Sequence, residues 1–227
     1  MPWTIWDGIG LILWSVLAQT IVALPLLAAG IDPSQGLTTF IVLIAAQALT
    51  FVGIVGWLRA RGGLSWRLFG PLRPAWSHVW IGVVIGLSGF VIVTLIVLIT
   101  AAAFGPLQPP EQIVLERLTE SPAAMTLGFV AAVLLAPIVE ELIFRAVLFQ
   151  AFRQRMGLWP AVGFSSFIFG LSHVELYPVP FFVVVLAIFG FLLAAAFHHA
   201  GSLVVPILAH AVFNGVELSV ALLVLPR

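Results

Sequence analysis

The chain has 227 residues, of which 62% are hydrophobic and only 8% are charged. A soluble domain carries about 25% charged residues, so this composition excludes an ordinary soluble protein and indicates an integral membrane protein. The formal net charge is +0 and there is no cysteine. The charge indicates no nucleic-acid partner, and the missing cysteine excludes disulfides, thiolate catalysis and cysteine-type zinc sites.

Seven apolar segments approach the roughly 20 residues that a membrane-spanning helix needs. They are 8–29, 37–58, 77–104, 122–155, 158–173, 181–198 and 202–225. An eighth span, hidden by a split within one segment, is the alternative. The predicted fold is an all-α, polytopic transmembrane bundle of about seven to eight spans with a polar intramembrane site.

We expect a single membrane domain over 1–227. Its first part, 1–121, holds three spans and ends in an interfacial segment, 105–121, where three glutamates and two prolines interrupt the apolar pattern. The second part, 122–218, is the candidate catalytic core.

The arginines predict the orientation. Six of the nine lie in the loop 59–76 and the turn 153–157, namely Arg59, Arg61, Arg67, Arg73, Arg153 and Arg155. Loops rich in basic residues stay in the cytoplasm, so the N-terminus is predicted to be cytoplasmic. The composition favours a prokaryotic plasma membrane, with the lipid bilayer as the first partner.

A few strongly polar residues lie inside the apolar segments. They are Glu140, Glu141, Arg145, His173, His210, Asn214 and Glu217. A charge inside the bilayer costs roughly 2.5 kcal/mol or more, so such residues are candidates for a functional site.

The spacing of the first four suggests how they meet. Glu141 and Arg145 are four residues apart and can pair on one helix face, whereas Glu140 points about 100° away and stays free. Glu140 and His173 lie at equal distances from the turn Met156-Gly157, so in an antiparallel hairpin they reach the same depth. The alternatives are a purely structural ion-pair cluster and a core histidine.

His210 and Asn214 are again four apart and share a helix face. Their alternative role is an interhelical hydrogen bond that only stabilises the bundle. Glu217 lies on the same face, and no role is assigned to it.

These side chains suit hydrolysis of an amide bond by water. Glu140 is the predicted general base, His173 helps to hold the water, and His210 and Asn214 can donate to the oxyanion. Glu141 and Arg145 support the site. No cofactor is favoured; the alternative is zinc, with Glu140, His173 and His210 as ligands.

Three motifs stand in order on these helices: Glu140-Glu141-x-x-x-Arg145, Phe169-x-x-x-His173 and His210-x-x-x-Asn214. Together they resemble the CAAX prenyl protease and bacteriocin-processing family, also called the Abi family of intramembrane proteases. The resemblance covers about 122–218. It implies a membrane endopeptidase open to the cytosolic side, in which the first glutamate and the second motif's histidine activate water. The third motif then forms the oxyanion hole.

The resemblance implies that the substrate is a peptide or a protein C-terminus, prenylated in some members. It also leaves a second function class, a non-catalytic membrane scaffold or bacteriocin immunity protein. A transporter with a carboxylate proton relay is a third class, but the sequence has no internal repeat to favour it.

Overall fold

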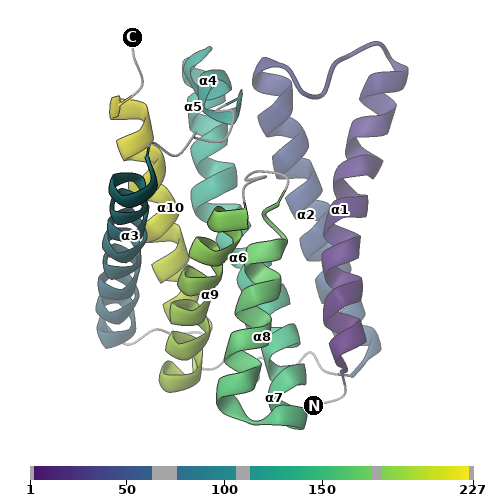
Figure 1. Ribbon diagram of the computed structural model, residues 1–227. Helices are drawn as coiled ribbons and strands as arrows, with labels where there is room; N and C mark the ends of the chain where they lie inside the picture. Colours follow the sequence, from purple (N-terminus) through teal and green to yellow (C-terminus); the bar gives the residue numbers. More distant parts are fainter. Residues whose placement is uncertain (1–2, 63–75, 106–112, 175–179, 225–227) are drawn as a thin grey trace.

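The computed structural model describes residues 3–62, 76–105, 113–174 and 180–224, and all regular structure in them is helical. Figure 1 shows the helices as a bundle, with α1 and α2 on one side, α3 and α10 on the other, and the segment from α5 to α8 between them. The elements are α1 (Ile5–Ala28), α2 (Gly36–Ala60), α3 (Trp76–Phe104), α4 (Ile113–Thr119), α5 (Pro122–Phe129), η2 (Val130–Leu135), α6 (Ala136–Glu141), η3 (Leu142–Phe149), α7 (Gln150–Met156), α8 (Leu158–Leu171), α9 (Pro180–Ala200) and α10 (Val204–Val224), where η marks a π-helical segment.

Six helices in the described part of the chain are long and apolar enough to cross a membrane. The helical membrane bundle is therefore confirmed, but the predicted number of seven to eight spans is too high by this measure. The fifth predicted span, 158–173, is the 14-residue helix α8. At 1.5 Å per residue it measures about 21 Å, less than the roughly 30 Å of hydrocarbon that a spanning helix crosses.

One continuous helical rod of 35 residues, Pro122–Met156, carries the first motif. Its start is defined by Ser121, whose hydroxyl accepts a hydrogen bond from the Ala124 amide at 3.1 Å, and by Pro122 in the first turn. Its end is Gly157, whose φ of +81° is left-handed and starts the turn into α8. Two π-helical segments, η2 and η3, lie on either side of the short α6.

The first π-helical segment has a local cause. A proline in a regular α-helix lacks an N–H and collides with the carbonyl four residues earlier. Pro137 stands in the first turn of α6, directly after η2, and the wider π-helical turn accommodates it. Such turns often occur at functional sites.

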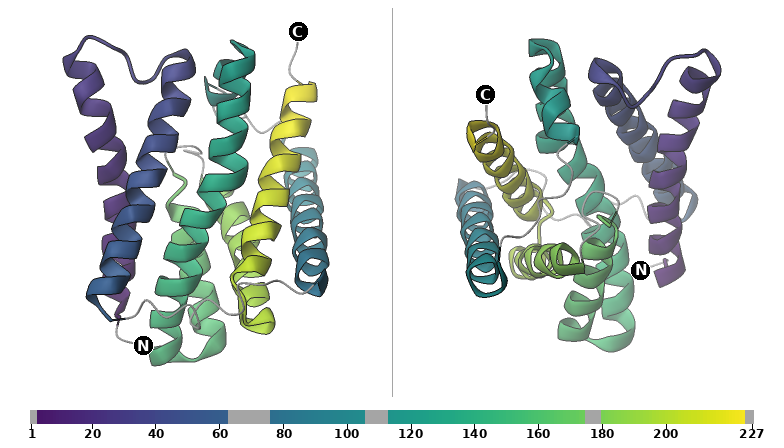
Figure 2. Two further views of the ribbon diagram at one scale, coloured as in Figure 1. Left: turned by 180° about the vertical axis from the view of Figure 1, so that it is seen from behind. Right: turned by 45° about the horizontal axis from the view of Figure 1, so that its top comes forward.

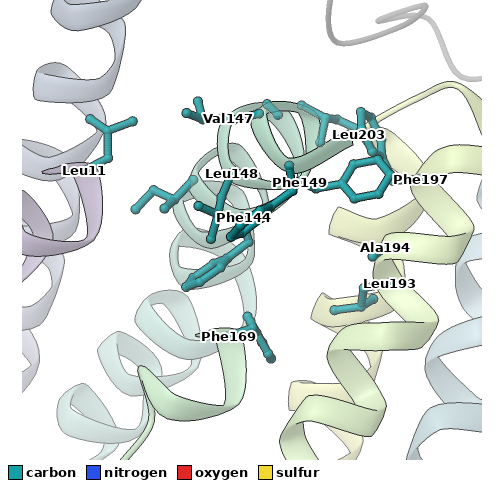
Figure 3. Close-up of a cluster of buried hydrophobic side chains, with 14 of the residues drawn as sticks. Leu11, Phe144, Val147, Leu148, Phe149, Phe169, Leu193, Ala194, Phe197 and Leu203 are labelled. Carbon is teal, nitrogen blue, oxygen red and sulfur yellow. The ribbon is translucent and has the colours of Figure 1, made fainter. Parts of the chain in front are cut away.

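The core of the bundle surrounds η3, in which seven of the eight residues are buried. Figure 3 shows side chains of η3 packed between helices that lie far apart in the sequence. The labelled members are Leu11 from α1, Phe144, Val147, Leu148 and Phe149 from η3, Phe169 from α8, and Leu193, Ala194 and Phe197 from α9, with Leu203. This packing holds the first and second motifs in a fixed relation.

Close packing against α3 fixes the position of α10. Gly82, Gly86 and Gly89 are buried on α3. A Cβ atom added at Gly86 would lie 2.5 Å from the Ala209 carbonyl oxygen of α10, so only glycine permits this approach. Ala209 directly precedes His210.

The positions of the chain ends and turns agree with helices that cross the membrane in alternating directions. The start of α1 lies at the same end as the turn between α7 and α8, and α10 ends at the opposite end (Figures 1 and 2). At the first end Arg61 forms an ion pair with Asp7 at 2.6 Å. Most of the predicted loop 59–76 lies outside the described residues.

The segment predicted to be interfacial contains the short helix α4. Its Leu115 and Leu118 are buried in a small cluster with Phe40 and Ala124. One face of α4 is thus apolar and packs against the bundle.

Candidate functional site

The two adjacent glutamates of α6 point into different surroundings. The Glu141 side chain is 0% exposed, whereas the Glu140 side chain keeps 26% of its surface accessible. Consecutive residues of a helix point about 100° apart, so one carboxylate enters the protein interior and the other faces an accessible space.

Glu141 lies between a guanidinium and an imidazole. Its Oε2 is 3.0 Å from Nε of Arg145, in an ion pair that is not aligned as a hydrogen bond. Its Oε1 accepts a hydrogen bond from Nδ1 of His210 at 3.0 Å. The sequence predicted the pairing with Arg145 but not the link to His210 on α10. Glu141 therefore joins the first motif to the third.

Arg145 is 1% exposed, and its remaining contacts come from α8 and α9. Its Nη2 donates to the Gly190 carbonyl at 3.2 Å. Its Cζ lies over the Phe169 ring at 4.7 Å from the centroid, a distance at which a cation interacts favourably with an aromatic face. The second motif's phenylalanine thus supports the first motif's arginine.

His173 lies just after the end of α8 and faces Glu140. Its Nδ1 donates a hydrogen bond to the Phe169 carbonyl at 2.8 Å, because a carbonyl oxygen can only accept. Its Nε2 lies 3.6 Å from Oε2 of Glu140. The equal depth of Glu140 and His173 that the sequence predicted is found in the structure.

His210 brings a second imidazole to the same carboxylate. Its Nε2 is 3.9 Å from Oε2 of Glu140, and its side chain is only 4% exposed. Phe169 and Phe189 pack edge-on against its ring. Because Nδ1 of each histidine donates to a fixed acceptor, both Nε2 atoms are left to face Glu140.

The distances around Glu140 suit a small polar molecule held between these groups. Separations of 3.6 and 3.9 Å exceed a direct hydrogen bond. Among the described residues, Oε2 of Glu140 has no hydrogen-bonding partner. A water that donates to Glu140 Oε2 and to a neutral imidazole Nε2 would satisfy both acceptors.

Asn214 lies one turn beyond His210 on α10 and contacts η2. Its Nδ2 donates to the Ala132 carbonyl at 2.8 Å. From α2, Nε2 of Gln47 donates to the neighbouring Ala131 carbonyl at 3.4 Å. The sequence gave no sign of either contact, because the acceptors are backbone atoms of alanines.

Four other polar residues lie outside this arrangement. Ser165 and Ser166 donate to the Val162 carbonyl and Ser172 to the Phe169 carbonyl, so all three bind backbone carbonyls of α8. Glu217 is exposed on α10.

The zinc alternative names Glu140, His173 and His210 as ligands. Over the described ranges of the chain, no group of three or more His, Asp or Glu side chains has the arrangement of a metal site. Oε2 of Glu140 nevertheless lies 3.6 and 3.9 Å from the two Nε2 atoms, and both the zinc alternative and the expectation of no cofactor stay predictions.

Comparison with known protein families gives one match. Residues 122–216 match the model of a family described as "Type II CAAX prenyl endopeptidase Rce1-like". Comparisons with curated proteins and with solved structures gave no match.

The matched range contains all six predicted site residues, from Glu140 to Asn214, and it agrees with the predicted resemblance over 122–218. It also supports a membrane-embedded peptidase. The segment 122–216, and with it the candidate site, is thus similar to the Rce1-like family of type II CAAX prenyl endopeptidases.

Proposed function

We propose that the chain is an intramembrane endopeptidase of the CAAX prenyl protease type, in which Glu140 and His173 activate a water molecule. The observation that supports this most directly is the convergence of three side chains from three helical segments. Oε2 of Glu140 lies within 3.9 Å of both Nε2 atoms. A purely structural ion pair needs only Glu141 and Arg145, and it would not explain why the partly exposed Glu140 faces two imidazoles.

In the first step the water attacks the carbonyl carbon of the scissile peptide bond. Glu140 accepts one of its protons as general base. His173, whose Nδ1 is held by the Phe169 carbonyl, accepts the other hydrogen in a hydrogen bond through Nε2 and so orients the water. The product of this step is a tetrahedral intermediate with one negative oxygen.

His210 and Asn214 stabilise that oxygen. To donate through Nε2 while Nδ1 donates to Glu141, His210 must carry protons on both nitrogens. Asn214 has a second N–H besides the one that Ala132 accepts.

In the second step the intermediate collapses and the C–N bond breaks. Glu140 returns its proton to the leaving nitrogen, which departs as an amine, and the new carboxyl group carries the oxygen of the water. Glu140 is then ready for another cycle, and no cofactor is consumed. We infer that this chemistry is metal-free.

The family description supports a proposal for the substrate. We infer that it is a protein C-terminus ending in a prenylated CaaX sequence, cut near the cytosolic face of the membrane. The end of the bundle with Arg61, Arg153 and Arg155 would face the cytosol under the positive-inside rule.

Glu140→Gln and His173→Ala test the proposal. The purified proteins would be incorporated into lipid vesicles with a quenched fluorescent peptide ending in a farnesylated CaaX sequence, and with the same peptide unprenylated. We expect either substitution to lower kcat by about 10²–10⁴-fold, the usual contribution of general acid–base catalysis. Glu116→Gln, an exposed carboxylate on α4, is the matched control and should keep full activity.

The outcomes separate the function classes. Full activity in a folded Glu140→Gln protein would rule out the proposed base. A wild-type protein that cuts neither peptide, nor any protein in a membrane extract, would favour the non-catalytic scaffold.

A further inference from the structure

We propose that Pro137 is a positioning residue of this site: it leaves the Ala132 carbonyl without a helical partner, and that carbonyl then fixes the side-chain amide of Asn214. The inference rests on the proposed function, in which the side-chain amide of Asn214 donates a hydrogen bond to the oxyanion. That amide must therefore be held in place. It concerns a proline three residues before Glu140, outside the three motifs.

The backbone hydrogen bonds of η2 show how the carbonyl becomes free. The Ala136 amide donates to the Ala131 carbonyl, five residues earlier. In the same π-helical pattern the next donor, at position 137, would pair with Ala132. Position 137 is a proline and has no N–H. An unpaired buried carbonyl costs about 1–3 kcal/mol, so a donor from elsewhere is strongly favoured.

That donor comes from the third motif. Nδ2 of Asn214 lies 2.8 Å from the Ala132 oxygen, and the two residues are 82 positions apart in the chain. A side-chain amide is planar, and its two N–H bonds diverge by about 120°. Fixing one on Ala132 therefore also fixes the direction of the other, which is the donor that an oxyanion requires. A donor that is already oriented costs no reorganisation during the reaction.

The same π-helical segment is also held from the opposite side. Gln47 of α2 donates to the Ala131 carbonyl at 3.4 Å, next to the acceptor used by Asn214. Side chains from α2 and α10 thus bind adjacent carbonyls of η2. The carbonyl that orients Asn214 is therefore fixed in position.

Pro137→Ala has opposite expected effects on stability and on activity. Alanine supplies an N–H that competes for the Ala132 carbonyl and releases Asn214. Alanine also suits a helix better than proline, so the melting temperature should stay the same or rise. We expect kcat to fall about 10–100-fold, a loss typical of a misplaced or missing donor, with KM changed less than twofold.

A double-mutant cycle tests the connection through Asn214. The four proteins are wild type, Pro137→Ala, Asn214→Ala and the double variant, measured with the farnesylated peptide in vesicles. If Pro137 acts through Asn214, Pro137→Ala should have no further effect on kcat in the Asn214→Ala background. Pro25→Ala, which removes a proline inside α1 far from the site, is the matched control and should leave kcat unchanged.

A second measurement does not depend on activity. Asn214 is the only asparagine in the chain, so selective ¹⁵N labelling of asparagine gives a single side-chain NH₂ group in an NMR spectrum. In wild type we expect one of its two protons to be shifted downfield and protected from solvent exchange. In Pro137→Ala both protons should move toward the positions of a free amide.

The two measurements distinguish failure of the inference from failure of the proposed function. Two protons at the positions of a free amide that exchange rapidly with solvent in the wild-type protein would overturn the inference without requiring Pro137→Ala to fold. Additive losses of kcat in the cycle would overturn it as well. A protected amide in a protein that cuts no peptide would instead refute the proposed function and leave the hydrogen bond established.

Discussion

Replacing Arg145 by methionine would show how strongly the buried charges depend on one another. The side chains of Arg145 and Glu141 are 1% and 0% exposed, so solvent does not screen their interaction. Removing one partner of a buried pair costs about 3–5 kcal/mol, because the other charge is left uncompensated. For a chain of this length that loss corresponds to a drop in Tm on the order of 10 °C.

The structure indicates how large the loss of stability should be within the range of about 3–5 kcal/mol for a broken buried pair. Arg145→Met also removes the charged hydrogen bond to the Gly190 carbonyl and the contact with the Phe169 ring. Glu141 keeps its hydrogen bond from His210, which compensates part of its charge. We therefore expect a loss of about 3 kcal/mol, at the lower end of the range.

Thermal unfolding in one detergent, followed by tryptophan fluorescence, would measure the effect. Arg61→Met is the matched control, because Arg61 is 49% exposed in its ion pair with Asp7 and such pairs contribute at most about 1 kcal/mol. The double variant Glu141→Leu/Arg145→Met removes both charges and should regain most of the lost stability. It should still fail to cleave peptide, because His210 loses its acceptor. If Arg145→Met melts at the same temperature as Arg61→Met, breaking the buried pair does not cost the expected amount of about 3 kcal/mol.

Two further predictions concern metal dependence and helix packing. Treatment with 1,10-phenanthroline followed by dialysis should leave peptide cleavage unchanged; activity that disappears and returns with added zinc would contradict the metal-free mechanism. Gly86→Ala should lower the free energy of unfolding by about 1–3 kcal/mol and also reduce kcat, because the new Cβ would lie 2.5 Å from the Ala209 carbonyl and push α10 away. Gly56→Ala on α2, where an added Cβ meets nothing within 4 Å, is the control, and equal stability in the two variants would refute the packing argument.

Spacing along the chain predicted much of the site. Helical periodicity was enough to pair Glu141 with Arg145, because both residues belong to one helical rod. Equal distances from a turn were enough to bring His173 to the depth of Glu140. The helical bundle followed from composition alone, since few soluble folds tolerate so little charge. The catalytic roles of these residues are still predictions.

Contacts between distant segments could not be predicted in the same way. The hydrogen bond from His210 to Glu141 depends on how α10 docks, and no pattern within either segment encodes it. The Asn214 amide binds a backbone carbonyl, which every residue has, so the identity of Ala132 carries no signal. The segment 158–173 was counted as a span although its helix α8 has only 14 residues, because composition alone does not say whether a short apolar segment crosses the membrane. Pro137 was the one visible sign of an irregular helix in this region.

The pairing of Glu141 with Arg145 also bears on how the chain enters the membrane. A carboxylate and a guanidinium four residues apart on one helix can neutralise each other before any other segment is present. The rod can therefore pass from the translocon into lipid as a nearly neutral unit, at a lower cost than two separate charges. Glu140 has no such partner on its own helix and meets His173 and His210 only when α8 and α10 arrive. The reactive centre is therefore complete only in the folded bundle, when α8 and α10 have packed against the rod.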